Sequence, residues 1–217
     1  KDQLRIALQM AGKPPTTRID AELARELAYR RSVRALVEGK IARLGQGYAI
    51  VVRVVDVDSA RVVLSVSDVA SNGETLIPTV GRIARKLREG LGERRQAIRA
   101  SRPLAEVMTP SFEAYRKHVK ARELNVGADP RRAIDLDREA LALDSDFASA
   151  WAGIGVAYRN LGIADSALAA FREALRRPQR LTDRQRLMYE AFVAELHGDL
   201  AAPLAIYDRV VDADPSY

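Results

Sequence analysis

"WAGIGVAYRNLGIADSALAAFREAL", residues 151–175, is the stretch that decides the fold. Four of its residues follow the spacing i, i+3, i+4 and i+7, which places them on one face of a helix: Trp151, Ile154, Gly155 and Tyr158. Three more share a face of a second helix: Ala167, Phe171 and Ala174. Between the two faces, Gly162 can adopt the left-handed conformation that ends a helix. The stretch therefore predicts two amphipathic helices joined by a tight turn.

A single helical hairpin cannot bury its apolar faces alone, and the sequence contains two further copies of this pattern. A shift of 34 residues toward the N-terminus aligns Ala121 with Gly155. A shift of 36 residues toward the C-terminus aligns Ala191 with Gly155 and Tyr207 with Phe171. The outer copies are less regular than the central one.

The pattern W-x2-I-G-x2-Y followed by A-x3-F-x2-A resembles the tetratricopeptide repeat (TPR). The resemblance implies an all-α TPR solenoid of about three helical hairpins over residues 110–217. The hairpins would cover residues 110–145, 146–180 and 181–217. An unrelated helical bundle is the alternative.

The first half of the chain changes from helical to strand periodicity. A helix is predicted over residues 19–31, with Asp20 as its N-cap and Leu23 and Leu27 as its apolar stripe. Valine-rich runs follow at residues 33–44, 48–57 and 61–70, separated by the short links "GQG" and "DSA". Such runs predict an antiparallel three-stranded meander. A long helix is predicted over residues 76–99, with one apolar side made of Ile83, Leu87 and Leu91.

This order gives an α+β N-terminal domain, a meander with flanking helices. "LVEGK" at residues 36–40 and "DVDSARVV" at residues 56–63 resemble the TolB-like α/β module that precedes TPR arrays in large bacterial signalling proteins. The resemblance covers residues 1–100, with a linker at residues 101–109. It also implies that a first strand and a helix of the module are missing at the N-terminus, which would leave a sheet edge that favours a homodimer or another partner.

The two ends of the sequence lead to one further expectation. The chain begins with Lys1 and ends at "DPSY", where a TPR array would continue. We therefore expect a piece of a longer polypeptide, the alternative being a chain trimmed by a few residues.

Charge is distributed unevenly over the 217 residues, whose net charge is +6. Residues 1–109 carry 20 Lys and Arg against 12 Asp and Glu, whereas residues 110–217 carry 15 against 17. One basic cluster lies in the predicted long helix: Arg82, Arg85, Lys86, Arg88, Arg94, Arg95 and Arg99. Another comprises Arg172, Arg176, Arg177, Arg180, Arg184 and Arg186. Nucleic acid is nevertheless not expected as a partner, because acids are mixed in and no aromatic residues alternate with the arginines.

The sequence contains few residues suited to chemistry. It has no cysteine and only two histidines, His118, expected to be solvated or in a groove, and His197, expected at a helix end. Asp56, Asp58, Asp212 and Asp214 are interpreted as turn and helix-end residues. No phosphate-binding loop and no apolar run long enough to span a membrane is found. We therefore predict no catalytic, cofactor-binding or metal-binding residues and no enzyme activity for this chain.

The first helices of a TPR array line a concave groove that commonly holds a peptide or a partner helix. The register fixed by Trp151 places a candidate groove set on these helices: Tyr115, His118, Arg122, Asn125, Ser149, Arg159, Asn160, Gln185, Met188, Phe192 and Glu195. Arg122 and Arg159 would bind carboxylates of a ligand. The open alternative is that both arginines pair with neighbouring acids such as Glu123 or Asp129.

The function expected from these observations is a non-catalytic protein- or peptide-binding scaffold or sensory module. The resemblance implies the tail of a bacterial signalling protein, namely a serine/threonine kinase. It would be periplasmic or extracytoplasmic behind a membrane-anchored kinase, and otherwise cytoplasmic. The alternative is a nucleic-acid-associated module of a transcriptional regulator that uses the basic N-terminal domain.

Overall fold

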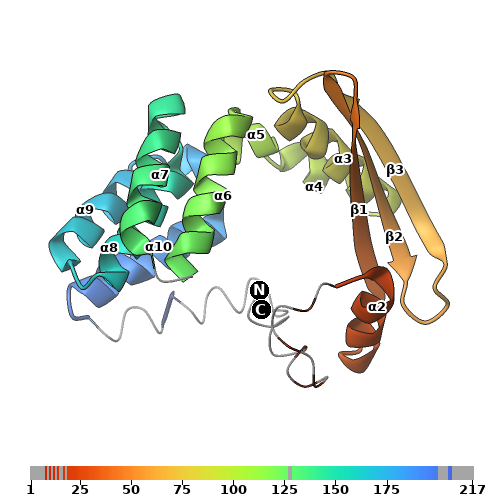
Figure 1. Cartoon of the computed structure of the whole chain (residues 1–217), viewed down its shortest axis with the longest axis horizontal. Coiled ribbons are helices and arrows are strands. Elements are labelled where there is room, and N and C mark those ends of the chain that lie inside the picture. Colours follow the sequence, from red (N-terminus) through yellow and green to blue (C-terminus); the bar gives the residue numbers. More distant parts are fainter. Residues whose placement is uncertain are drawn as a thin grey trace. The chain divides into compact units, whose positions relative to one another are not determined.

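The computed structural model describes residues 19–126 and 129–199, together with positions 8, 10, 12, 14, 17, 205 and 206. It combines a three-stranded antiparallel sheet with helices, and its C-terminal half is rich in helix (Figure 1). The chain divides into two compact units. The sheet unit comprises Lys1–Asn72 and Arg82–Ser101, and the helical unit comprises Gly73–Gly81 and Arg102–Tyr217.

The sheet unit begins with helix α2 (Ala21–Arg30), as the sequence predicts. Asp20 caps the helix, because its side chain accepts a hydrogen bond of 2.9 Å from the backbone N–H of Leu23. Leu23 and Leu27 are buried and pack in one apolar cluster with Leu8. The N-cap and the buried apolar stripe therefore both stabilise this helix.

The predicted meander is confirmed. Strands β1 (Ala35–Leu44), β2 (Gly47–Asp56) and β3 (Val62–Ala70) pair in the order β1-β2-β3, and both pairs are antiparallel. The first hairpin turns over two residues and has Gly45 at φ +61°, a conformation that favours glycine. Ile50 and Val54 of the central strand are buried.

The prediction of a single long helix over residues 76–99 is wrong, because the structure divides this stretch into two helices. Helix α3 (Leu76–Gly90) is followed by a break and then by α4 (Arg95–Ala100). Gly92 has φ +85°, which ends the helical course, and Leu91 is 60% exposed instead of lying on the apolar side. Asp68 of β3 binds Arg82 and Lys86 at 3.0 and 3.5 Å, so the second half of α3 is attached to the sheet.

In the described part of the helical unit, the further helices are α5 (Leu104–Val107), α6 (Phe112–Val126), α7 (Pro130–Leu143), α8 (Ala148–Asn160), α9 (Ala164–Leu175), the 3₁₀ helix η1 (Pro178–Arg180) and α10 (Asp183–Leu196). From α6 to α10, each α-helix packs against the next, and α6 also packs against α8. The segment 101–109 takes part in this unit, because Arg102 donates hydrogen bonds to the backbone oxygens of Gln179 and Leu181 at 2.7 and 2.5 Å.

The helical hairpin predicted from residues 151–175 is confirmed as α8 and α9. Gly162 lies between them at φ +73°. A Cβ on Gly155 would lie 2.9 Å from the ring of Phe171, so glycine permits the close approach of the two helices. Trp151 is half-buried and packs against two apolar clusters. The second helix predicted for the last hairpin, which includes Tyr207, lies outside the described residues.

Candidate functional site

The candidate groove set lies on three helices of the helical unit. Helix α6 carries Tyr115, His118, Arg122 and Asn125; α8 carries Ser149, Arg159 and Asn160; and α10 carries Gln185, Met188, Phe192 and Glu195. Direct side-chain contacts join α8 both to α6 and to α10. The structure thus brings most of the set together, although its members differ in how much of each side chain is accessible.

A hydrogen-bonded group connects α8 to α10 at one end of the set. Gln185 donates from Nε2 to Ser149 Oγ at 3.1 Å, and Ser149 is buried. Tyr189, on α10, is only 6% exposed. Burial raises the pKa of Tyr189 above its ordinary value, so the phenol stays protonated at neutral pH. Spacing in the sequence does not reveal that Tyr189 packs in this part of the unit.

Arg159 is engaged within the protein. Its guanidinium lies 3.5 Å from Glu195 and 4.3 Å from the centre of the Phe192 ring. All three residues belong to the candidate set, and together they link α8 to α10. The acid that pairs with Arg159 is therefore Glu195, and not Glu123 or Asp129. The stacked position over an aromatic ring is typical of arginine.

Arg122 differs from Arg159. It is exposed, and within the described residues it has neither an ion pair nor a hydrogen bond from its side chain. The neighbouring Glu123 pairs instead with Lys120 at 3.2 Å, and Asp129 caps α7 through the backbone N–H of Arg132. The positive charge of Arg122 nevertheless acts on two buried groups, where it opposes the rise that burial causes in the pKa of Asp137 and of Tyr189. Arg122 is therefore an accessible cation beside buried polar groups.

The expectation that His118 is solvated is wrong. His118 is 7% exposed, and its Nδ1 forms a 2.7 Å hydrogen bond with Oδ1 of Asp137, which is fully buried on α7. The ring of His118 also meets the edge of Phe147 at a centroid distance of 5.1 Å. This hydrogen bond pairs one oxygen of the buried carboxyl group with the His118 ring, which lowers the cost of burying both side chains.

Asp137 occupies a tight site. Its Oδ2 has no hydrogen-bond partner among the described residues, and a Cβ on Gly153 would lie 2.1 Å from this oxygen. Burial raises the pKa of Asp137, and the opposing effects of His118 and Arg122 do not outweigh it. Asp137 stands 34 residues before Phe171, so the signal that could have found it was a carboxylate at an aromatic position of the repeat.

The two asparagines of the set join α6 to α8. Asn125 donates from Nδ2 to the backbone oxygen of Gly153 at 3.3 Å. Asn160 donates from Nδ2 to the backbone oxygen of Asn125 at 3.4 Å. Asn160 is exposed, whereas Asn125 is half-buried. Their amides thus hold the two helices in register.

The two remaining members of the set are half-buried apolar contacts. Tyr115 packs against the cluster that contains Phe147, and Met188 packs against the cluster that contains Phe171. Neither His118 nor Ser149 is accessible to a ligand. The exposed members of the set are therefore Arg122, Asn160 and Glu195.

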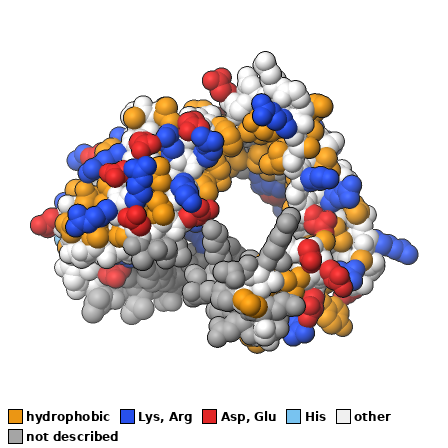
Figure 2. Space-filling view, viewed as in Figure 1, with side chains coloured by type: hydrophobic (Ala, Val, Ile, Leu, Met, Phe, Trp, Pro, Cys, Tyr) orange, Lys and Arg blue, Asp and Glu red, His pale blue; other side chains and the backbone are white. Residues whose placement is uncertain are grey.

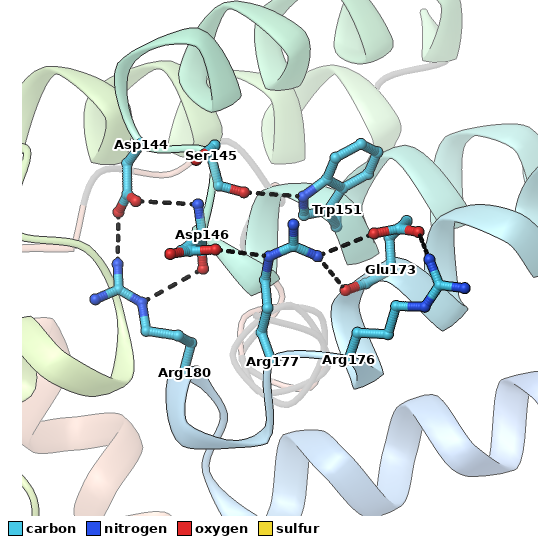
Figure 3. Close-up of polar contacts among 8 residues, drawn as sticks. All are labelled: Asp144, Ser145, Asp146, Trp151, Glu173, Arg176, Arg177 and Arg180. Carbon is cyan, nitrogen blue, oxygen red and sulfur yellow. Dashed lines mark hydrogen bonds and ion pairs between the residues drawn. The ribbon is translucent and has the colours of Figure 1, made fainter.

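The second basic cluster is used largely for internal contacts (Figure 3). Arg180 binds Asp144 at 2.5 Å, and Arg177 binds Asp146 and Glu173 at 3.1 Å each. Arg176 also binds Glu173. Trp151 donates from Nε1 to the backbone oxygen of Ser145 at 3.2 Å beside these pairs. Acidic and basic side chains likewise lie next to each other over the face of the helical unit seen in Figure 2.

Part of the first basic cluster is also paired. The hydrogen bond from Arg82 lowers the pKa of Asp68 to about 2, and Lys86 contributes its charge. Arg88 binds Glu93 at 2.5 Å across the break between α3 and α4. These contacts hold the helix to the sheet and close its C-terminal end.

Other chemistry-bearing residues have structural positions. His197 is the C-cap of α10, as expected from the sequence, and Gly198 follows it at φ +80°. Asp56 accepts hydrogen bonds from Ser59 in the turn between β2 and β3, as its interpretation as a turn residue predicts. Asp212 and Asp214 lie outside the described residues. In the described ranges, no group of three or more acidic or histidine side chains is placed to hold a metal ion, and no helix meets the length and hydropathy needed to cross a membrane.

Comparison of the whole sequence with protein-family models gives no match, and a comparison with curated proteins finds no similar sequence either.

Proposed function

We propose that the helical unit is a non-catalytic module that binds a protein or peptide segment along α6, α8 and α10. The observation that carries the proposal is Arg122, an exposed cation without a partner in the described part of the chain, whose charge acts on the buried Asp137 and Tyr189. Such a residue offers a charge-assisted hydrogen bond to a ligand carboxylate. The ligand would need little reorganisation of the protein, because the neighbouring side chains are already held.

The surroundings of Arg122 support a peptide as the ligand. Asn160 and Glu195 are exposed on α8 and α10, and Phe192 is half-buried beneath Arg159. Amide and carboxylate groups can bind a peptide backbone, and a partly accessible aromatic ring can contact an apolar side chain. The sequence resemblance to TPR arrays favours the same use of these helices.

The resemblance also supports a proposal about the parent protein. The module would be a scaffold or sensory tail of a bacterial signalling protein, a serine/threonine kinase being the first candidate. Nucleic-acid binding through the sheet unit is the alternative proposal. It would depend on Arg85, Arg94, Arg95 and Arg99, for which no ion pair is found in the described residues.

The experiment is peptide selection followed by a matched pair of variants. A displayed library of random peptides with free C-terminal carboxylates is selected against the whole chain, and enriched peptides are synthesised and titrated. Arg122→Ala should weaken binding by roughly 10- to 150-fold, as expected for a lost charge-assisted contact. Arg116 is the control, because it is on the same helix with its side chain 69% exposed and pairs with Glu113.

Arg116→Ala should change the affinity by less than about twofold. Both variants should have the melting temperature of the wild type, since neither arginine has a buried hydrogen-bond or ion-pair partner. Failure to enrich any peptide, or equal affinity of the two variants for the enriched ones, contradicts the proposal. Salt-dependent binding of DNA that persists in Arg122→Ala would favour the nucleic-acid alternative.

A further inference from the structure

Strand β1 is an open edge of the sheet. It pairs with β2 on one side, and within the described residues no strand pairs with its other side (Figure 1). Three apolar side chains of β1 are largely exposed, namely Val37, Ile41 and Leu44 at 67%, 61% and 60%. An exposed apolar edge strand of ten residues tends to pair with another strand.

The backbone of β1 has free hydrogen-bonding groups at alternate residues. The hairpin closes on the pair Leu44 and Gly47 around a two-residue turn, and such hairpins close on a hydrogen-bonded pair. Even-numbered residues from Leu36 to Leu44 therefore bond to β2. Val37, Gly39 and Ile41 direct their N–H and C=O groups to the open edge instead. A second strand could bond to these groups without disturbing the existing sheet.

The sequence of β1 is complementary to itself about Gly39. Two antiparallel copies of one edge are related by a two-fold axis perpendicular to the sheet, so the axis passes beside a single residue. With the axis at Gly39, Val37 lies opposite Ile41 of the second copy, and Glu38 lies opposite Lys40. Each of these pairs occurs twice.

The neighbouring registers are unfavourable. With the axis at Glu38 the two Glu38 carboxylates face each other, and with the axis at Lys40 the two ammonium groups do so. Like charges directly opposite destabilise a strand pair, whereas opposite charges stabilise it. Glu38 lies opposite Arg53 of β2, but neither Glu38 nor Lys40 has an ion-pair partner among the described residues. Charge therefore selects the register at Gly39.

The apolar pairs continue rows that already exist in the sheet. Val37 is the cross-strand neighbour of Val54, and Ile41 is the neighbour of Ile50. Val54 and Ile50 are 3% and 4% exposed. A Val37–Ile41 contact between copies would extend these buried rows across the new strand pair.

The strand at the opposite edge of the sheet, β3, is not complementary to itself in this way. Self-pairing of β3 about its central Val66 would place Leu64 opposite Asp68. Asp68 already binds Arg82 and Lys86. β3 is therefore not a second candidate edge.

We propose that two copies of this chain associate through antiparallel pairing of their β1 strands about Gly39, which gives a continuous six-stranded sheet. The interface lies on the sheet unit, and the proposal does not depend on the groove set. The partner strand is a second copy of β1, because antiparallel pairing about Gly39 places the negative Glu38 of each copy opposite the positive Lys40 of the other.

The first experiment uses the absence of cysteine from the sequence. A Cβ on Gly39 meets no atom within 4 Å, so Gly39→Cys should fold normally. Hydrogen-bonded antiparallel partners have Cα atoms about 5.5 Å apart, a separation that a disulfide can bridge. Mild oxidation should therefore convert Gly39→Cys into a covalent dimer. Ser67→Cys, on the exposed part of β3, is the control and should stay monomeric under the same oxidation.

The second experiment tests the register by sedimentation equilibrium. Glu38→Lys and Lys40→Glu should each weaken self-association by roughly tenfold or more, because two attractive pairs become repulsive. An equimolar mixture of these two variants should associate as tightly as the wild type, and the double exchange Glu38→Lys/Lys40→Glu should do the same. Circular dichroism verifies that each variant is folded.

A wild-type chain that stays monomeric at all accessible concentrations overturns the proposal. So does a mixture that associates no better than either single variant. A Gly39→Cys protein that resists cross-linking contradicts the pairing of two copies about Gly39.

Discussion

At the scale of single residues, one helical hairpin has a buried polar pair where the next hairpin has an aromatic ring. Phe171 packs on Tyr189 and Phe192 with ring centroids 6.1 and 5.3 Å apart. Asp137, at the matching position of the preceding hairpin, bonds to His118 and approaches Gly153. A carboxylate needs less space than a phenyl ring but must be hydrogen-bonded, so His118 and Gly153 accompany it.

The burial of Asp137 predicts a specific dependence of stability on pH. The pKa of Asp137 is raised in the folded protein, because burial disfavours the carboxylate more than His118 and Arg122 favour it. Below the ordinary pKa of aspartate, both folded and unfolded chains hold the proton, and this contribution to stability is complete. As the pH rises through the raised pKa, the unfolded chain releases its proton more readily, and the contribution is lost.

Asp137→Asn removes this titration while keeping an oxygen that accepts from His118. The variant should therefore gain in free energy of unfolding relative to the wild type as the pH rises from about 4 to about 7. Urea denaturation of both proteins across this range measures the difference, in which titrations common to both cancel. If the free energy of unfolding of the wild type instead rises relative to that of the variant with rising pH, the ionised carboxylate is stabilised by its surroundings.

Spacing predicted which helices carry the candidate site, but not the state of each side chain in it. The sequence predicts a solvated or groove position for His118, because it does not show which residue faces His118 from α7. Arg122 and Arg159 could not be distinguished either, since one pairs with Glu195 and the other has no partner among the described residues. Contacts between helices depend on packing angles and rotamers, which residue periodicity does not contain.

At the scale of elements, the connections between helices are fixed by the arginines of Figure 3. The turn after α7 contains Asp144 and Asp146, and the segment after α9 contains Arg177 and Arg180. The Arg180 and Asp144 side chains are only 16% and 14% exposed, and Arg180 also donates to the backbone oxygen of Asp146 at 3.3 Å. These bonds join two turns that lie more than 30 residues apart in the chain.

Arg180 and Arg176 form a matched pair of test positions. Arg180→Ala should lower the free energy of unfolding by about 1–3 kcal/mol, because Asp144 loses a charge-assisted bond in a partly buried place. Arg176 pairs with Glu173 but its side chain is 72% exposed, so Arg176→Ala should cost less than about 1 kcal/mol. Chemical denaturation of the two variants compares them directly. Equal losses would mean that the pairing of Arg180 adds no stability beyond that of a surface ion pair.

The sequence predicted elements well where one local rule governs them. The three strands alternate with short turns, and α2, α8 and α9 follow apolar spacing with a cap or a glycine at an end. The break between α3 and α4 was missed because the apolar spacing of Ile83, Leu87 and Leu91 continues through it. Gly90 and Gly92 were the local signal, and the contact of Gly90 with Leu64 of β3 shows why the first of these positions is small.

At the scale of the whole molecule, one helix contributes to both compact units. Residues Gly73–Gly81 belong to the helical unit, and the helix residues from Arg82 onward belong to the sheet unit. In the helical unit, a Cβ on Gly73 would lie 3.7 Å from Phe112, and one on Gly81 would lie 3.6 Å from Leu104. Composition and proline content direct attention to residues 101–109 as the linker, and neither reveals that the first turns of α3 pack with the helices.

Two isoleucines of α3 allow this division to be tested in the intact chain. Ile77 is 6% exposed and lies in the helical unit, whereas Ile83 is 2% exposed and lies in the sheet unit. Each truncation to alanine should cost about 2–4 kcal/mol through lost burial and the cavity left behind. If the units open separately, Ile77→Ala should speed amide hydrogen exchange in peptides from α6 and α7, and Ile83→Ala should speed it in β2 and β3. Mass spectrometry of exchanged peptides measures both regions in one experiment. If each variant instead accelerates exchange equally in both regions, the two units unfold as one. A loss of packing in one unit leaves the exchange of the other unchanged only when the units open separately.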